Sequence, residues 1–176
     1  MPDNSAEFIG DIPRHYDTGL GPNIFVDFAD RLTSAACDGR STHAIELAAG
    51  TGIVSRKLRD GLPPETALLV TDLNPPGFYK VPFHYGNPEE VRRDLKAAGW
   101  QDVKHETMRL TKKIVDPEAF ARGLVYGNPL IDEIRNREGV DPEAVATAVL
   151  DALNATFGPS DMTMPLEATM FTCTAT

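Results

Sequence analysis

The stretch His43-Ala44-Ile45-Glu46-Leu47-Ala48-Ala49-Gly50-Thr51-Gly52-Ile53-Val54 decides the expected fold of this chain. An apolar strand that ends in an acidic residue, turns through two glycines and enters a helix is the opening of a doubly wound α/β domain. The glycines allow the backbone to approach a ligand closely, and the helix amino terminus favours polar or anionic groups of that ligand. The pattern predicts a strand over 43–48 and a helix over 52–60.

A second apolar run, Leu68-Leu69-Val70-Thr71, ends in Asp72 about twenty residues after the glycine turn, a spacing that nucleotide-binding folds share. In such folds a carboxylate at this position hydrogen-bonds a ribose diol. The run predicts a strand over 67–71, so Glu46 and Asp72 are expected at the carboxyl ends of neighbouring strands, where open α/β sheets bind ligands. The alternative is that both carboxylates are inherited and idle.

The remaining elements follow from helix-capping residues and hydrophobic spacing. Asn87, Asp116 and Asp141 each precede Pro and Glu, which is typical of a helix amino terminus. The sequence predicts a mobile amino-terminal arm, helices over 23–36, 88–98, 117–126, 130–138 and 142–156, and strands over 103–110 and 165–174.

Charge and length limit the functions that the chain can carry. The 176 residues are 41% hydrophobic, which suffices for one domain with its own core. The net charge is -9 and the 17 basic residues form no cluster, which argues against nucleic acid or an anionic membrane as a partner. The chain begins without a basic and then apolar leader, and Cys37 and Cys173 form no metal or disulfide pattern, so a cytoplasmic location is expected.

The chain resembles the class I S-adenosylmethionine-dependent methyltransferases. Residues 46–52 match the family's first motif, with Ala48 where many members have glycine, and Asp72 matches the acidic end of the second strand. Residues 12–25 are similar to the segment that covers the cofactor in one bacterial subgroup, and 78–176 are similar to that subgroup's carboxyl-terminal third. The resemblance covers both ends of the chain and implies a Rossmann-like fold.

The middle of the family's fold is missing from this chain. Between Asn74-Pro75 and Pro76-Gly77, family members carry three more strand-helix units, roughly 80 residues at about 30 per unit. Those units supply the wall over the adenine, the strand at which substrate chemistry occurs and the centre of the sheet. Two absent strands leave a gap of roughly 14 Å, and unpaired sheet edges need partners. We therefore expect either closure within the chain or a homodimer, with or without exchanged carboxyl-terminal elements.

These inferences define one expected architecture. The fold class is α/β, a truncated Rossmann-like three-layer sandwich without its central strand-helix units. Residues 1–176 form a single domain, in which 1–22 are an arm or lid, 23–75 the first Rossmann-like half and 76–176 the methyltransferase-like carboxyl-terminal part.

Three functions remain open from the sequence. Methyl transfer is implied by the family, and it requires S-adenosylmethionine in a pocket that dimerisation completes. A noncatalytic binding remnant is the second. The third, which we take as the leading hypothesis, is a glycoside hydrolase that needs no cofactor. The chain is similar to truncated methyltransferase-like proteins associated with glycosidase activity, and a former ribose site already holds groups that bind sugar hydroxyls.

The candidate catalytic residues are Asp72 as sugar-hydroxyl anchor or base, Glu46 as the second carboxylate, and Tyr16 or His15 as proton donor from the arm. Each of them also has a structural explanation, as a lid residue, helix cap or idle remnant. No metal site is expected, because His-Glu-x-x-His and Cys-x-x-Cys patterns are absent from the sequence. The candidate ligand-binding residues are Gly50, Thr51, Gly52, Asn74, Tyr79, His84 and Tyr85, of which the aromatic ones have the alternative role of loop anchors.

Overall fold

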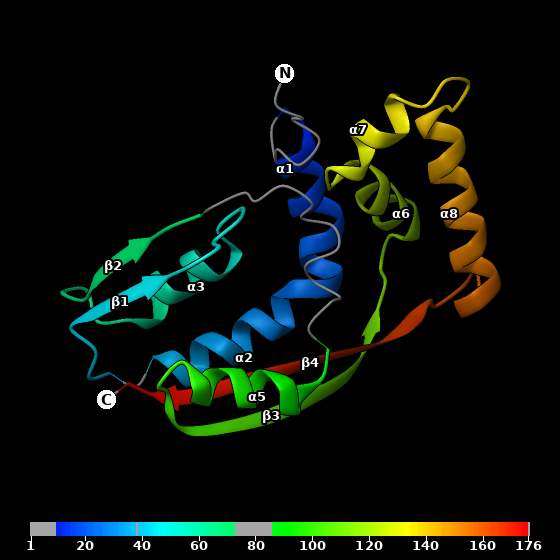
Figure 1. Ribbon diagram of the computed structural model, residues 1–176. Helices are drawn as coiled ribbons and strands as arrows, with labels where there is room; N and C mark the ends of the chain where they lie inside the picture. The colour runs from blue at the N-terminus through cyan, green and yellow to red at the C-terminus, as the bar shows by residue number, and fades with distance from the viewer. Residues whose placement is uncertain (1–9, 38, 73–85, 176) are drawn as a thin grey trace.

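The computed structural model describes residues 10–37, 39–72 and 86–175. Helices and two small sheets are arranged around a long amino-terminal helical segment (Figure 1). In chain order the elements are α1 (Ile12–His15), η1 (Tyr16–Phe25), α2 (Val26–Ala36), β1 (His43–Glu46), α3 (Ile53–Gly61), β2 (Ala67–Val70), α5 (Pro88–Ala97), β3 (Gln101–Lys113), α6 (Pro117–Tyr126), α7 (Leu130–Arg135), α8 (Pro142–Phe157) and β4 (Thr163–Thr174).

The amino-terminal segment is helical from Ile12 onward. The helices α1, η1 and α2 follow one another directly, and η1 is a π-helix that contains Pro22. Proline lacks an N–H and its ring clashes with the carbonyl four residues earlier, which disfavours ordinary α-helical bonding at this point. The buried Asn23 side chain donates a hydrogen bond from Nδ2 to the Gly19 carbonyl at 2.8 Å. Residues 12–22, which were expected to form an arm, are helical in the structure and pack on α6.

The helices η1 and α6 cross so closely that their backbones touch. A Cβ built on Gly19 would lie 2.7 Å from the Cα of Gly123, and one built on Gly123 would lie 2.8 Å from the Cα of Gly19. Glycine at both positions is what permits this approach. Leu20 of η1 and Phe120 of α6 belong to one of the clusters of buried side chains, which comprises Leu20, Ile114, Phe120, Met162 and Met164.

The strands form two separate two-stranded sheets. The strands β1 and β2 are parallel, with Ile45 opposite Leu69, and β3 and β4 are antiparallel, with His105 opposite Phe171. Among the residues that the structure describes, no strand pairing joins the two sheets. The α/β class is confirmed at this coarse level, whereas one central sheet between two helical layers is not formed by the described residues.

The predicted elements are present, with differences at their ends. The strands β1 and β2 stop at Glu46 and Val70, short of the predicted 48 and 71, although the Thr71 N–H still donates to the Glu46 carbonyl. The helix α7 ends at Arg135, before the predicted 138, and β3 extends beyond 103–110 on both sides. The predicted caps are confirmed, since the side chains of Asn87, Asp116 and Asp141 accept hydrogen bonds from the N–H groups of Glu89, Ala119 and Glu143.

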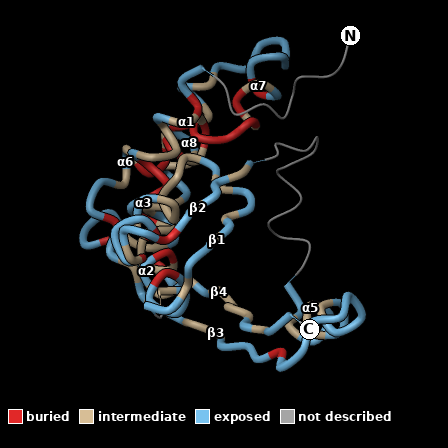
Figure 2. The backbone as a smooth tube through the Cα atoms, turned by 90° about the vertical axis from the view of Figure 1, so that its left-hand side faces the viewer, coloured by how far each residue is buried: buried red, intermediate tan, exposed pale blue. Residues whose placement is uncertain are grey.

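The long helix α2 lies between the two sheets (Figure 1). Arg31 of α2 bonds Glu106 of β3 at 2.6 Å, and Asp27 bonds Lys112 of the same strand at 2.6 Å. Figure 2 shows that buried segments concentrate in the helices, while β1 and β2 are largely exposed. Within the described segments no helix combines the length and apolarity that crossing a membrane requires.

One face of the small parallel sheet, which carries Ile45 and Leu69, is exposed in the single chain. Parallel sheets are normally covered on both faces, yet Ile45 is 66% exposed and Leu69 is 57% exposed. Each of the two strands also has one edge without a strand partner among the described residues. We therefore expect a homodimer in light scattering, and a shift toward the monomer mass when Ile45 and Leu69 are both replaced by Ser. A stable monomer at micromolar concentration would contradict this expectation.

Candidate functional site

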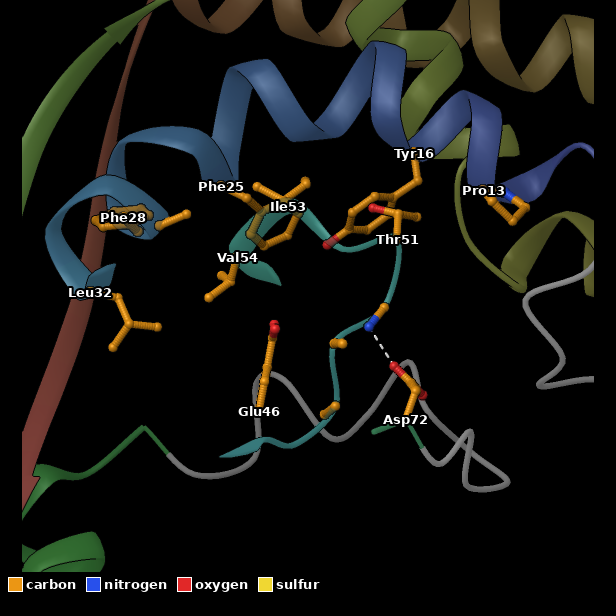
Figure 3. A pocket seen from close by; sticks show the side chains of 14 residues that line it. Pro13, Tyr16, Phe25, Phe28, Leu32, Glu46, Thr51, Ile53, Val54 and Asp72 are labelled. Atoms are coloured by element: carbon orange, nitrogen blue, oxygen red, sulfur yellow. Dashed lines mark hydrogen bonds between the residues drawn. The ribbon is translucent and has the colours of Figure 1, made fainter. Parts of the chain in front are cut away.

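A pocket of about 530 Å³ lies between the amino-terminal helices and the loop that joins β1 to α3. Helical side chains line one wall, and the ends of β1 and β2 supply the opposite one (Figure 3). The volume falls within the usual range for small-molecule sites. The lining residues are Pro13, Tyr16, Phe25, Phe28, Ala29, Leu32, Glu46, Ala48, Ala49, Gly50, Thr51, Ile53, Val54 and Asp72.

The loop between β1 and α3 adopts a left-handed backbone conformation three times. Gly50 has φ 56° and Gly52 has φ 81°, which glycine adopts without steric cost. Ala48 has φ 58°, in the same left-handed region.

 Because most residues with a Cβ avoid the left-handed region, Ala48 is a point of backbone strain in the lining of the pocket. Gly52 serves as the N-cap of α3 and is not itself among the lining residues.

The two candidate carboxylates both reach this pocket. Asp72 accepts a hydrogen bond through Oδ2 from the backbone N–H of Gly50, which fixes the end of β2 against the glycine loop. Glu46 extends from the end of β1 into the space below the apolar wall (Figure 3). Its Oε2 is buried and has no hydrogen-bond partner among the described residues. A buried polar atom without a partner is costly, and a ligand hydroxyl placed there would satisfy it.

Tyr16 contributes a ring and a hydroxyl to the same pocket. Its ring stacks on that of Phe25 with centroids 5.2 Å apart. Burial and, secondarily, the neighbouring Asp17 charge raise the pKa of Tyr16 to about 12. The hydroxyl therefore stays protonated near neutral pH and is suited to donate a hydrogen bond rather than to give up its proton.

The raised pKa of Tyr16 predicts a loss of stability in alkali. The unfolded chain releases this proton near pH 10, whereas the folded chain holds it until about pH 12, so unfolding becomes easier as pH rises through that window. We expect the urea midpoint of the Tyr16→Phe variant to fall less between pH 9 and pH 11 than that of the wild type, roughly as the linkage relation requires. Equal falls in the two proteins would show that Tyr16 does not carry the effect.

Polar side chains of η1 and α3, which were not among the predicted site residues, lie beside the pocket. Arg56 of α3 donates through Nη1 to the Thr51 carbonyl at 2.9 Å, and its Nη2 lies 3.9 Å from Asp17 of η1. The hydroxyls of Thr51 and Ser55 and one oxygen of Asp17 are buried without a hydrogen-bond partner among the described residues. The polar pairing between η1 and α3 was not predicted, because 1–22 were expected to form an arm.

The apolar wall was also not predicted as part of the site. Phe25, Phe28 and Leu32 have helical spacing, which the sequence indicates only as the buried face of a helix. The structure directs these side chains toward the glycine loop, and Leu32 remains 43% exposed. Nothing in their spacing distinguishes a pocket wall from ordinary core.

His15 is not part of this pocket. Its ring lies 5.3 Å from that of Tyr126, at a second cavity of about 520 Å³ between α1, α6 and α7. Arg122 and the Tyr126 hydroxyl each donate a hydrogen bond to Glu143, and the bond from Tyr126 is 2.5 Å long. These hydrogen bonds lower the pKa of Glu143. The proposal of His15 as a proton donor next to Glu46 is therefore corrected, because α1 turns its side chain toward α6.

Four candidate ligand-binding residues, Asn74, Tyr79, His84 and Tyr85, lie outside the described residues. The pocket thus unites Tyr16, Glu46, Gly50, Thr51 and Asp72 from the sequence-predicted set. Within the described ranges no group of three or more His, Cys, Asp and Glu side chains could hold a metal ion.

Comparisons of the chain with models of protein families, with curated proteins and with solved structures gave no significant match.

Proposed function

We propose that the protein is a glycoside hydrolase whose active site is the pocket between η1, α2 and the β1–α3 loop. The observation that carries the proposal is that the Glu46 and Asp72 carboxylates line one cavity of ligand size, at the ends of adjacent strands. Glycoside hydrolysis needs two such groups, one to protonate the leaving oxygen and one to assist at the sugar. The Thr51 and Tyr16 hydroxyls add polar groups that suit sugar recognition.

The hydrogen bonds of the two carboxylates suggest different roles. One oxygen of Asp72 is engaged by the Gly50 N–H, so its position is set, and we assign it to sugar hydroxyls and to stabilising positive charge at the anomeric carbon. The partnerless Oε2 of Glu46 is available to a substrate, and we assign Glu46 as the proton donor.

The proposed reaction breaks the bond between the anomeric carbon and the glycosidic oxygen. Protonated Glu46 gives its proton to that oxygen, which leaves as an alcohol with the electron pair of the broken bond. Water adds to the anomeric carbon and releases a proton to Glu46 or to Asp72. Where Asp72 takes the proton, exchange with solvent returns Asp72 to the carboxylate and Glu46 to the acid. Tyr16 donates a hydrogen bond and keeps its proton throughout, in keeping with its raised pKa.

The direct test is the release of nitrophenol from a panel of nitrophenyl hexosides, pentosides and uronides by purified protein. Turnover is expected without an added cofactor and in the presence of a chelator. Proton magnetic resonance of the first product anomer then distinguishes retention from inversion, which depends on the spacing of the two carboxyl groups. If no member of the panel is cleaved, the hydrolase proposal fails and a noncatalytic binding role is favoured.

A second candidate function is methyl transfer on a methyltransferase-derived, Rossmann-like scaffold. The observation in its favour is that Asp72 lies against the glycine loop, where a ribose diol binds in related folds. The missing strand-helix units remove the expected adenine wall, and high affinity depends on enclosing most of a ligand. We therefore expect weak binding of S-adenosylmethionine in calorimetric titration. Micromolar or tighter binding would instead favour the methyltransferase, completed by a second chain.

A further inference from the structure

We propose that this pocket selects neutral or cationic glycosides with an apolar aglycone and discriminates against anionic ones. The proposal rests on the proposed function for its chemistry, and it adds the substrate class. It is carried by two features of the pocket, namely an apolar wall on the helix side and, on the strand side, carboxyl groups without a Lys or Arg side chain in the described lining.

The helix side of the pocket forms an apolar wall. Phe25, Phe28 and Leu32 from the amino-terminal helices lie opposite the two strand ends, and Val54 of α3 continues the same surface (Figure 3). These side chains offer no hydrogen-bonding groups, so they cannot recognise hydroxyls. An aryl or alkyl aglycone packed against them would remove this apolar surface from water.

The strand side of the pocket carries negative charge. Glu46 and Asp72 line it, and no Lys or Arg belongs to the lining among the residues that the structure describes. The neighbouring Arg56 is directed to the Thr51 carbonyl and to Asp17. An anionic ligand would therefore meet the Asp72 carboxylate beside an apolar wall, where electrostatic repulsion is stronger than in bulk water.

Two fluorescent probes with the same aromatic skeleton test this inference without requiring hydrolysis. Phenylnaphthylamine is neutral, and anilinonaphthalene sulfonate adds one negative charge. At low ionic strength we expect the neutral probe to bind about ten-fold more tightly, as repulsion between the sulfonate and the Asp72 carboxylate predicts. The difference should shrink in the double variant Glu46→Gln, Asp72→Asn. Equal affinities in the wild type, or a tighter sulfonate, would overturn the inference.

Matched variants locate the binding site of the neutral probe. Replacing Phe28 with Ala removes part of the wall and should weaken binding roughly ten-fold. Replacing Leu69 with Ala alters an apolar side chain of comparable size on the exposed sheet face, outside the pocket, and should leave binding unchanged. If Leu69→Ala weakens binding as much as Phe28→Ala, the probe reports the sheet face and the inference is overturned.

The glycoside panel separates failure of this inference from failure of the proposed function. Cleavage of neutral aryl glycosides without cleavage of the matching uronides supports both. Cleavage of uronides at equal rates overturns the substrate class and leaves the hydrolase standing. Selective binding of the neutral probe without any turnover overturns the hydrolase, while the ligand class assigned to the pocket stands.

Discussion

Replacing Glu46 with Gln is expected to lower kcat for an activated aryl glycoside by about 100-fold or more, the usual effect of removing a general acid. Glutamine keeps the shape of the side chain and its capacity for hydrogen bonding, but it cannot give a proton to the leaving oxygen. The measurement is the initial rate of nitrophenol release across pH, together with KM, because the loss should appear in kcat. Glycosides with a more acidic leaving group should lose less, since they need less protonation.

The matched control for this prediction is Glu65→Gln, which makes the same chemical change at an exposed position in the turn before β2. Its kcat should equal that of the wild type. If Glu46→Gln is as active as the control and Asp72→Asn is also active, the chemistry resides elsewhere. Thermal unfolding of each variant shows whether a loss of rate reflects a loss of fold.

Gly19→Ala is expected to destabilise the protein by about 2 kcal/mol, in the range typical of overpacking. The new Cβ would lie 2.7 Å from the Ala119 carbonyl oxygen and 2.7 Å from the Gly123 Cα, and both are backbone atoms that cannot swing away. For a chain of this length, Tm should fall by roughly 4–8 °C in calorimetry. Because η1 carries Tyr16, the displaced helix should also weaken ligand binding in the pocket.

Gly86→Ala provides the matched control. A Cβ at Gly86 meets no atom within 4 Å, so its Tm should be unchanged or slightly higher, because alanine restricts the unfolded chain. Alanine is normally better than glycine inside a helix, so propensity alone predicts that Gly19→Ala stabilises. A Tm for Gly19→Ala at or above the wild-type value would show that the helices separate without cost.

Local signals in the sequence predicted most of the elements. The Asp-Pro-Glu pattern at Asp116 and Asp141 places an acceptor, a fixed φ and a favourable charge within three residues, and each part acts locally. Glu46 and Asp72 were likewise predicted at the ends of neighbouring strands, and in the structure both line one pocket. Such features depend on neighbouring residues or on a single strand pairing.

The parts that could not be predicted depend on long-range packing. The spacing of Phe25, Phe28 and Leu32 defines one face of a helix but not what that face meets. The π-helix over 16–25 contains Pro22, and its Gly19 lies against Gly123, which is far away in the chain. The orientation of His15 toward Tyr126 depends on the same packing.

The separation of the two sheets has a consequence for how rigidly the pocket is held. The η1–α6 crossing and its buried cluster belong to the best-packed part of the chain, whereas β1 and β2 form short, exposed strands. Regions with few buried apolar contacts open locally at a free energy below that of global unfolding. Glu46 and Asp72 thus lie at the ends of strands that have fewer buried contacts than the helices on the other side of the pocket. Part of the binding free energy of any ligand must therefore be spent on ordering these strands, and the affinity of the pocket is set by that ordering as well as by its contacts.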